Sequence, residues 1–133
     1  MKYMLLIQHG DMPRPGSPEW EALSAGEQKA IAADYQAVDR TEGVTPGAWL
    51  ESPETATSVW IEGGETLTTG GPFVAQKEAL NGYLFFEAEN LDAAIELAAR
   101  IPAARLGGRV EIRPVKKGYR ASSRSSARSE AAW

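Results

Sequence analysis

The single histidine of the chain, His9, is the side chain best suited to acid–base chemistry near neutral pH. It follows the apolar run 3–7, and Gly10 separates it from Asp11. Loops that leave strand ends often border clefts, and a carboxylate beside an imidazole can fix its tautomer and raise its pKa. The spacing therefore predicts a catalytic His9–Asp11 pair; a surface or hydrogen-bonding histidine is the alternative.

A second candidate site is the turn Gly71-Pro72-Phe73, which precedes a short polar segment containing Lys77. Backbone amides at the start of a short helix can bind an anion or a carboxylate. We therefore predict that Gly71, Pro72, Phe73 and Lys77 bind a ligand. On the alternative interpretation the turn is structural, Phe73 fills the core and Lys77 is solvated.

Aromatic side chains offer a third kind of site, because their rings can line a pocket for an aromatic ligand between sheets. The candidates are Trp20, Trp49, Trp60, Tyr3 and Tyr83. The same residues could equally be core and dimer contacts.

Several classes of chemistry are excluded by residues that the chain lacks. Without cysteine there is no disulfide, no thiol nucleophile and no thiolate metal site. A single histidine makes a transition-metal site unexpected. The sequence has no phosphate loop, dinucleotide fingerprint or nucleophile elbow. We therefore expect neither a metal nor a cofactor.

The charges divide the chain into two parts. Residues 1–115 carry seventeen acidic and nine basic side chains, which argues against nucleic-acid binding by the folded body. Residues 116–133 carry five basic side chains and one acidic, among many serines, and are expected to form a disordered basic tail. The apolar run near the N-terminus is too short for a signal peptide or a membrane span, so a soluble, cytoplasmic protein is expected.

Apolar periodicity and turn residues predict the order β-α-β-β-β-(short α)-β-α-β. The expected strands are 2–8, 48–52, a hairpin at 57–69, 82–88 and 108–115. The expected helices are a turn at 18–23, a helix from a Ser24–Glu27 capping box to about Thr41, a short helix after Phe73, and a helix capped by Asn90. The last helix should bury Leu91, Ala94, Ile95, Ala98 and Ile101.

This order predicts an α+β fold: a ferredoxin-like sheet with two crossover helices and an inserted hairpin. Two helices can cover only one face of such a sheet. The strands 2–8 and 82–88 are apolar on both sides, and burying one side chain the size of Phe is worth about 1.5–3 kcal/mol. We therefore expect a second copy of the chain to cover the other face in a homodimer.

Motifs spread along the chain resemble the DGPF-domain branch of the YCII-related proteins. They are Gly71-Pro72-Phe73, Lys77-Glu78, Gly82-Tyr83, Leu91-Asp92, Ala99-Arg100-Ile101-Pro102 and Glu111-Ile112-Arg113-Pro114. The resemblance covers nearly all of residues 1–115 and implies a ferredoxin-like domain that dimerises as an α+β barrel. The chain departs from the pattern at Gly70 and Ala75, where the family has carboxylates.

The resemblance and the candidate residues leave three interpretations of function. The first is a small dimeric protein of unassigned activity that binds a small molecule in a cleft near the end of the first strand and the Gly-Pro-Phe turn. The second is a cofactor-free enzyme that acts on a small aromatic or acidic compound with His9 and Asp11, as the resemblance implies for a few relatives. The third is an accessory partner of a sigma-factor-type transcription regulator.

Overall fold

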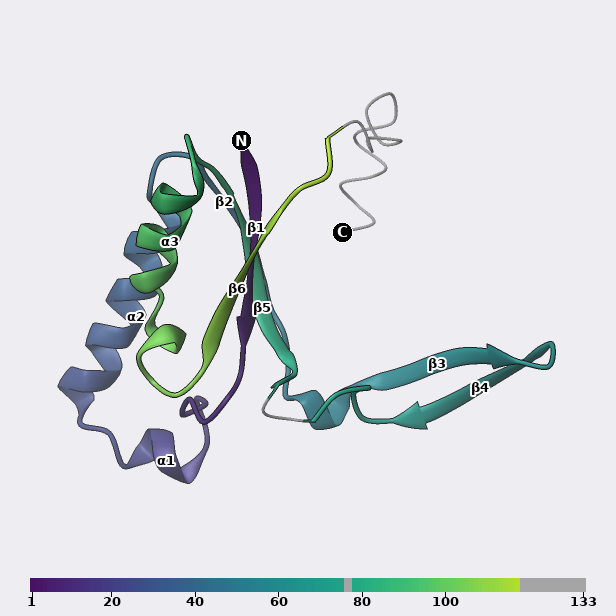
Figure 1. Cartoon of the computed structure of the whole chain (residues 1–133). Helices are drawn as coiled ribbons and strands as arrows, with labels where there is room; N and C mark the ends of the chain where they lie inside the picture. Colours follow the sequence, from purple (N-terminus) through teal and green to yellow (C-terminus); the bar gives the residue numbers. More distant parts are fainter. Residues whose placement is uncertain (76–77, 118–133) are drawn as a thin grey trace.

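An antiparallel four-stranded sheet lies at the centre of the computed structural model, which describes residues 1–75 and 78–117 (Figure 1). Its strands are β1 (Lys2–Gln8), β2 (Val44–Trp49), β5 (Leu80–Glu87) and β6 (Arg109–Pro114), in the order β2-β5-β1-β6. Without the inserted hairpin, this is the βαββαβ order and strand arrangement of a ferredoxin-like α+β fold, as predicted. Lys77 and residues 118–133 of the predicted tail lie outside the described residues.

The two longer helices begin at the predicted caps. In α2 (Ala25–Asp39), the Glu27 amide donates to the Ser24 hydroxyl at 3.0 Å and the Ser24 amide donates to the Glu27 carboxylate at 2.8 Å. In α3 (Leu91–Ala99), the Ala93 amide donates to the side-chain oxygen of Asn90 at 2.9 Å. These bonds satisfy amides that the first helical turn would leave unpaired. The shorter helical turns are α1 (Pro18–Glu21), η1 (Pro53–Thr55) and η3 (Pro102–Ala104).

The core lies between one face of the sheet and the layer formed by α2 and α3. Alternate residues of the central strands point into it, and all are 9% exposed or less: Tyr3, Leu5, Ile7, Leu84 and Phe86. The prediction for α3 was wrong in part, because Leu91 and Ile95 are about half exposed and Leu97 is buried. Ala94, Leu97, Ala98 and Ile101 form the buried stripe, at the i, i+3, i+4, i+7 spacing of a helix.

The other face of the sheet carries no helix in the described part of the chain (Figure 1). Its central residues are Met4, Leu6, Tyr83 and Phe85, here called the open face, and each is half-buried. In the strand pairing Met4 lies opposite Phe85 and Leu6 lies opposite Tyr83. The sheet therefore has one covered face and one apolar face that the described part of the chain leaves open, as the strand pattern predicted.

The strand β5 begins two residues earlier than expected. Asn81, which lies just before the expected strand, and Gly82, its expected first residue, lie inside β5 and are buried. Gln8 pairs with Leu80 and Ile7 pairs with Gly82, so Asn81 is an extra residue at a bulge. A bulge redirects the side chain of the inserted residue, and Asn81 takes part in the site described below.

A hairpin of β3 (Thr57–Glu62) and β4 (Glu65–Gly70) forms a separate two-stranded sheet that projects from the body (Figure 1). The hairpin expected at 57–69 is confirmed, and both glycines of its turn have positive φ, 57° at Gly63 and 81° at Gly64. The alternative in which Phe73 fills the core is wrong, because its side chain is 76% exposed. The Phe73 ring instead packs edge-on against Trp60, at 6.4 Å between centroids.

None of the helices in residues 1–75 and 78–117 combines the length and the hydropathy needed to cross a membrane.

Candidate functional site

A cavity of about 520 Å³ lies where the two N-terminal helices, the loop after β1 and the ends of β2 and β5 meet. Its lining is mainly apolar and aromatic. Trp20 comes from α1, Ile31 and Tyr35 come from α2, and Trp49 comes from the end of β2. Asn81, at the bulge of β5, contributes a polar side chain. We call this the aromatic cavity.

The position of Trp49 depends on a glycine in the neighbouring strand. A Cβ atom on Gly82 would lie 2.6 Å from Cε3 of the Trp49 ring, closer than atoms can approach. The ring therefore lies directly over the backbone of β5. It also meets Tyr35 edge-on, with 4.6 Å between centroids and 80° between planes. Such edge-to-face pairs are favourable beyond their burial, so two walls of the aromatic cavity hold each other in place.

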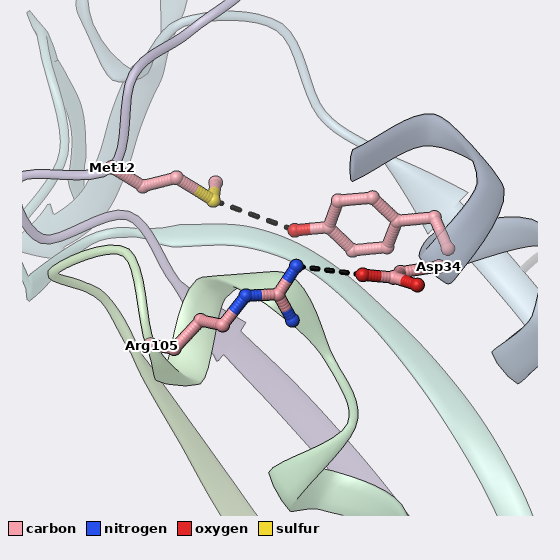
Figure 2. A network of polar contacts seen from close by, with 4 residues as sticks. Met12, Asp34 and Arg105 are labelled. Carbon is pink, nitrogen blue, oxygen red and sulfur yellow. Dashed lines mark hydrogen bonds and ion pairs between the residues drawn. The ribbon is translucent and has the colours of Figure 1, made fainter. Parts of the chain in front are cut away.

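Tyr35 is fixed at its hydroxyl as well. The hydroxyl donates to the sulfur of Met12 at 3.4 Å (Figure 2). Beside it, Arg105 donates to Asp34 at 2.6 Å and joins η3 to α2. Burial raises the pKa of Tyr35 to about 12. Tyr35 is therefore a neutral phenol near neutral pH, and it presents its ring to the cavity.

A second cavity of about 430 Å³ borders the first and contains the predicted acid–base residues. His9, Asp11, Ser17 and Glu19 line it. We call this the histidine cavity. Met12, Pro13 and Arg14 line both cavities, so the loop after β1 is the wall between them.

The loop that separates the cavities is anchored by backbone contacts. The His9 amide donates to the Ala79 carbonyl at 3.1 Å, and the Asp11 amide donates to the Gly107 carbonyl at 2.9 Å. Gly10 has a φ of 56°, and a Cβ there would collide with the Gly107 backbone. Only glycine fits this position. The loop is thereby tied to the segments that precede β5 and β6.

The side chain next to His9 is Arg14, which sequence analysis did not single out. Arg14 Nε donates to His9 Nε2 at 3.4 Å. Since a guanidinium can only donate, Nε2 must accept, and the neutral imidazole then carries its proton on Nδ1. Burial and the Arg14 charge lower the pKa of His9, and the Asp11 charge opposes this shift. His9 is therefore held mainly in its neutral form.

Two buried atoms of this pair have no hydrogen-bond partner among the described residues. They are His9 Nδ1 and Arg14 Nη2. Burial also lowers the pKa of Arg14, against the opposing charges of Glu54 and Glu51. No ion pair involving Arg14 is formed within residues 1–75 and 78–117. The wall between the cavities thus holds a partly desolvated cation.

The predicted site residues fall into two groups in space. His9 and Asp11 lie together in the histidine cavity, and Asp11 acts on the imidazole through its charge. Gly71, Pro72 and Phe73 line neither of the two cavities. The Gly71 amide donates to the Ala56 carbonyl at 2.7 Å, and its carbonyl accepts from the Ser58 hydroxyl at 2.7 Å. The Gly-Pro-Phe turn thus closes the base of the hairpin.

Of the predicted aromatic residues, Trp20 and Trp49 line the aromatic cavity. Tyr3 is in the core, Trp60 is on the hairpin and Tyr83 is on the open face. Tyr35, which also lines this cavity, was not among the predicted aromatic residues. Among residues 1–75 and 78–117, no group of three or more His, Asp or Glu side chains is placed to hold a metal ion.

Comparisons with known proteins agree with the motifs. The profile of the YCII-related domain matches residues 1–118. An uncharacterized protein of Rhizobium meliloti (strain 1021) is 30% identical over 99 residues, which are 71% of this chain and 80% of the relative. A solved structure, 5-chloro-2-hydroxyhydroquinone dehydrochlorinase (TftG) from Burkholderia phenoliruptrix AC1100 in complex with 2,5-dihydroxybenzoquinone, aligns at 15% identity and a TM-score of 0.39. The alignment covers 89% of this chain and 96% of the dehydrochlorinase chain. The chain belongs to the YCII-related family.

Proposed function

We propose that this protein binds a small aromatic molecule in the aromatic cavity, and that it does so as a homodimer. The observation that carries the proposal is the cavity itself: about 520 Å³ lined by Trp20, Tyr35 and Trp49, with a few polar side chains among the other lining residues. Ligand sites of small molecules have volumes of roughly 300–1,000 Å³, with apolar walls and a few polar groups that set orientation. The aromatic cavity has all three properties.

The aromatic walls are organised before any ligand binds. Gly82 lets the Trp49 ring lie over β5, and the Tyr35 ring is held by Trp49 and by Met12. A preformed site loses little side-chain freedom when a ligand enters. Flat rings could then stack or meet edge-on with these walls.

The test is direct binding to the wild-type protein and to a variant whose cavity is filled. Ala32 lines the cavity and is exposed on α2, so Ala32→Trp fills the cavity with little effect on the core. Ala33 is exposed on the same helix but does not line the cavity, so Ala33→Trp is the matched control. We expect calorimetric titration with indole and benzyl alcohol to show binding that Ala32→Trp weakens at least tenfold and Ala33→Trp leaves unchanged. Equal binding by all three proteins would contradict the proposal.

The open face supports the proposed homodimer. Met4, Leu6, Tyr83 and Phe85 form an apolar centre, and charged residues of β1 and β6 border it. Lys2 lies 5.1 Å from the Phe85 ring centroid, and Arg113 and Glu111 lie 3.9 Å apart on β6. An apolar centre inside a charged rim is the usual composition of an interface. Two open faces packed about a two-fold axis would close the α+β barrel.

A second candidate function, a cofactor-free enzyme, is favoured by the position of His9. The imidazole lies in a cavity with Asp11, within the field of that carboxylate. As a general base, His9 would have to release Arg14 from Nε2 before it could accept a proton there. The expected result is a conversion of a bound ligand, followed by NMR, that His9→Ala abolishes. In the wild type its rate should fall only as the pH drops through the lowered pKa of His9. A conversion that persists in His9→Ala would remove this role. Partnership with a transcription regulator and a cytoplasmic location stay predictions.

A further inference from the structure

We propose that Arg14 and His9 form an anion-binding subsite in the wall between the two cavities, and that the ligand is a small aromatic carboxylic acid. This rests on the proposed function of the aromatic cavity and names the class of molecule that would fill it. Arg14 and His9 both carry buried nitrogens without a partner in the described residues, and Arg14 lines the aromatic cavity.

Arg14 is a cation that the described part of the chain does not neutralise by direct contact. Its Nε donates a hydrogen bond to the uncharged imidazole of His9. Its buried Nη2 has no hydrogen-bond partner in residues 1–75 and 78–117. Glu51 and Glu54 act on it through their charges but form no ion pair with it. A desolvated cation without a bonded anion is unfavourable. The planar guanidinium has the donor geometry that a carboxylate matches.

His9 supplies a further donor in the same wall. Because Nε2 accepts from Arg14, the proton is on Nδ1, and this atom is also buried without a partner in the described residues. A buried donor left unpaired costs free energy that a bound acceptor or an ordered water would recover. Both of these unpaired nitrogens are hydrogen-bond donors, so they favour a ligand group that accepts hydrogen bonds.

The residues beside Arg14 indicate what the uncharged part of the ligand should be. Arg14 lines the aromatic cavity together with Trp49 and Tyr35. A ring among the aromatic side chains would allow a carboxylate, one bond away, to lie beside Arg14. Glu51 also lines the cavity and would repel this carboxylate. The Glu51 charge should therefore limit the affinity, and its removal should raise it.

The experiment compares benzoate with benzamide, which has nearly the same shape but no charge. We expect the wild-type protein to bind benzoate at least tenfold more tightly than benzamide. Arg14→Gln should lose this preference for benzoate over benzamide, and Glu51→Gln should bind benzoate several-fold more tightly. If benzamide and benzoate bind equally to the wild type, the anion subsite is overturned while the aromatic cavity stands. If neither binds, the proposed function fails as well.

A second measurement uses the fact that His9 is the single histidine of the chain. Its imidazole signals can be followed by NMR without assignment of other residues. The charged groups that line its cavity are Asp11, Arg14 and Glu19. A carboxylate beside Arg14 offsets the positive charge that disfavours protonation of the imidazole. Saturating benzoate should therefore raise the pKa of His9, and benzamide should not. An unchanged pKa with benzoate bound would place the anion elsewhere and overturn the subsite.

Discussion

The two faces of the central sheet are built from the same strands but differ in what covers them. On β1, Leu5 is fully buried against the helix layer, while its neighbour Leu6 lies half-buried on the open face. On β5, Leu84 and Phe86 point into the core while Tyr83 and Phe85 point away from it. The covered face is completed within one subunit. The open face has the composition of a core without the second layer.

This difference also separates the candidate site from the proposed dimer contact. The aromatic cavity is lined by α1, α2 and the ends of β2 and β5, so it belongs to one subunit. The residues of the open face do not line it. Ligand binding and dimerisation can therefore be disturbed independently, and the predictions that follow use this separation.

The largest effect is expected from Leu5→Ala on the covered face. Removing a fully buried leucine loses its transfer free energy and leaves a cavity, which lowers the free energy of unfolding by about 2–5 kcal/mol. The matched change on the open face, Leu6→Ala, should cost about 1 kcal/mol or less in a separated subunit. Urea unfolding followed by circular dichroism, at protein concentrations low enough to dissociate a dimer, measures both. Equal losses in the free energy of unfolding for the two variants would mean that both faces of the sheet are equally covered within one chain.

The next effect is expected at the proposed interface. Phe85→Glu would place a charge at the centre of the open face, opposite Met4. An unpaired charge in a packed interface should weaken association by about a hundredfold or more. Ile95→Glu is the control, since Ile95 is an exposed apolar residue of the helix layer. Light scattering should show a dimer for the wild type and Ile95→Glu, and a monomer for Phe85→Glu. A wild-type monomer at micromolar concentration would end the dimer proposal.

The sequence predicted the covered and open faces because both depend on local patterns. The alternation of β1, the Ser24–Glu27 capping box and the Asn90 cap are all visible within a few residues, and the structure confirms them. The buried stripe of α3 was misjudged, because Leu91, Ile95 and Leu97 are all apolar and only packing decides which of them is buried.

The candidate site was predictable only in part. Trp20 and Trp49 could be named as aromatic candidates. That both line the same cavity depends on contacts between distant segments of the chain. The Arg14–His9 contact arises from a loop with Pro13 and Pro15, whose path no periodicity describes. The bulge that places Asn81 beside the aromatic cavity is likewise a property of strand pairing and not of one strand. Long-range packing therefore determines which residues form the site, while local sequence patterns predict most of the fold.

A smaller effect is expected at Gly82, where the covered sheet meets the aromatic cavity. In Gly82→Ala the new Cβ would lie 2.6 Å from the Trp49 ring and 2.9 Å from the Ala48 carbonyl oxygen. The ring and the edge strand must shift, which should cost about 1–3 kcal/mol and weaken aromatic binding. Gly26→Ala in α2 meets only the Ser24 hydroxyl at 3.9 Å and should instead stabilise the protein by about 0.5–1 kcal/mol. Thermal unfolding and benzamide titration test both. A Gly82→Ala protein with unchanged stability and affinity would show that Trp49 does not depend on this glycine.

The smallest effect is a pH dependence at the start of α2, the helix that covers much of the core. The Ser24 amide and then its hydroxyl stabilise the ionised Glu27 carboxylate and hold the pKa of Glu27 below its usual value. Because the folded-state pKa is depressed, this contribution is fully present above the unfolded pKa of about 4.3. It is lost as the pH falls through the lower folded-state value. The stability difference between the wild type and Glu27→Gln should therefore be constant from pH 7 to pH 5 and shrink below pH 4.5. Ser24→Ala keeps the backbone amide of this contact and should retain most of the pH dependence, although the lost cap lowers stability at every pH. A difference that stays constant down to pH 3 would show that the carboxylate charge does not support this helix end.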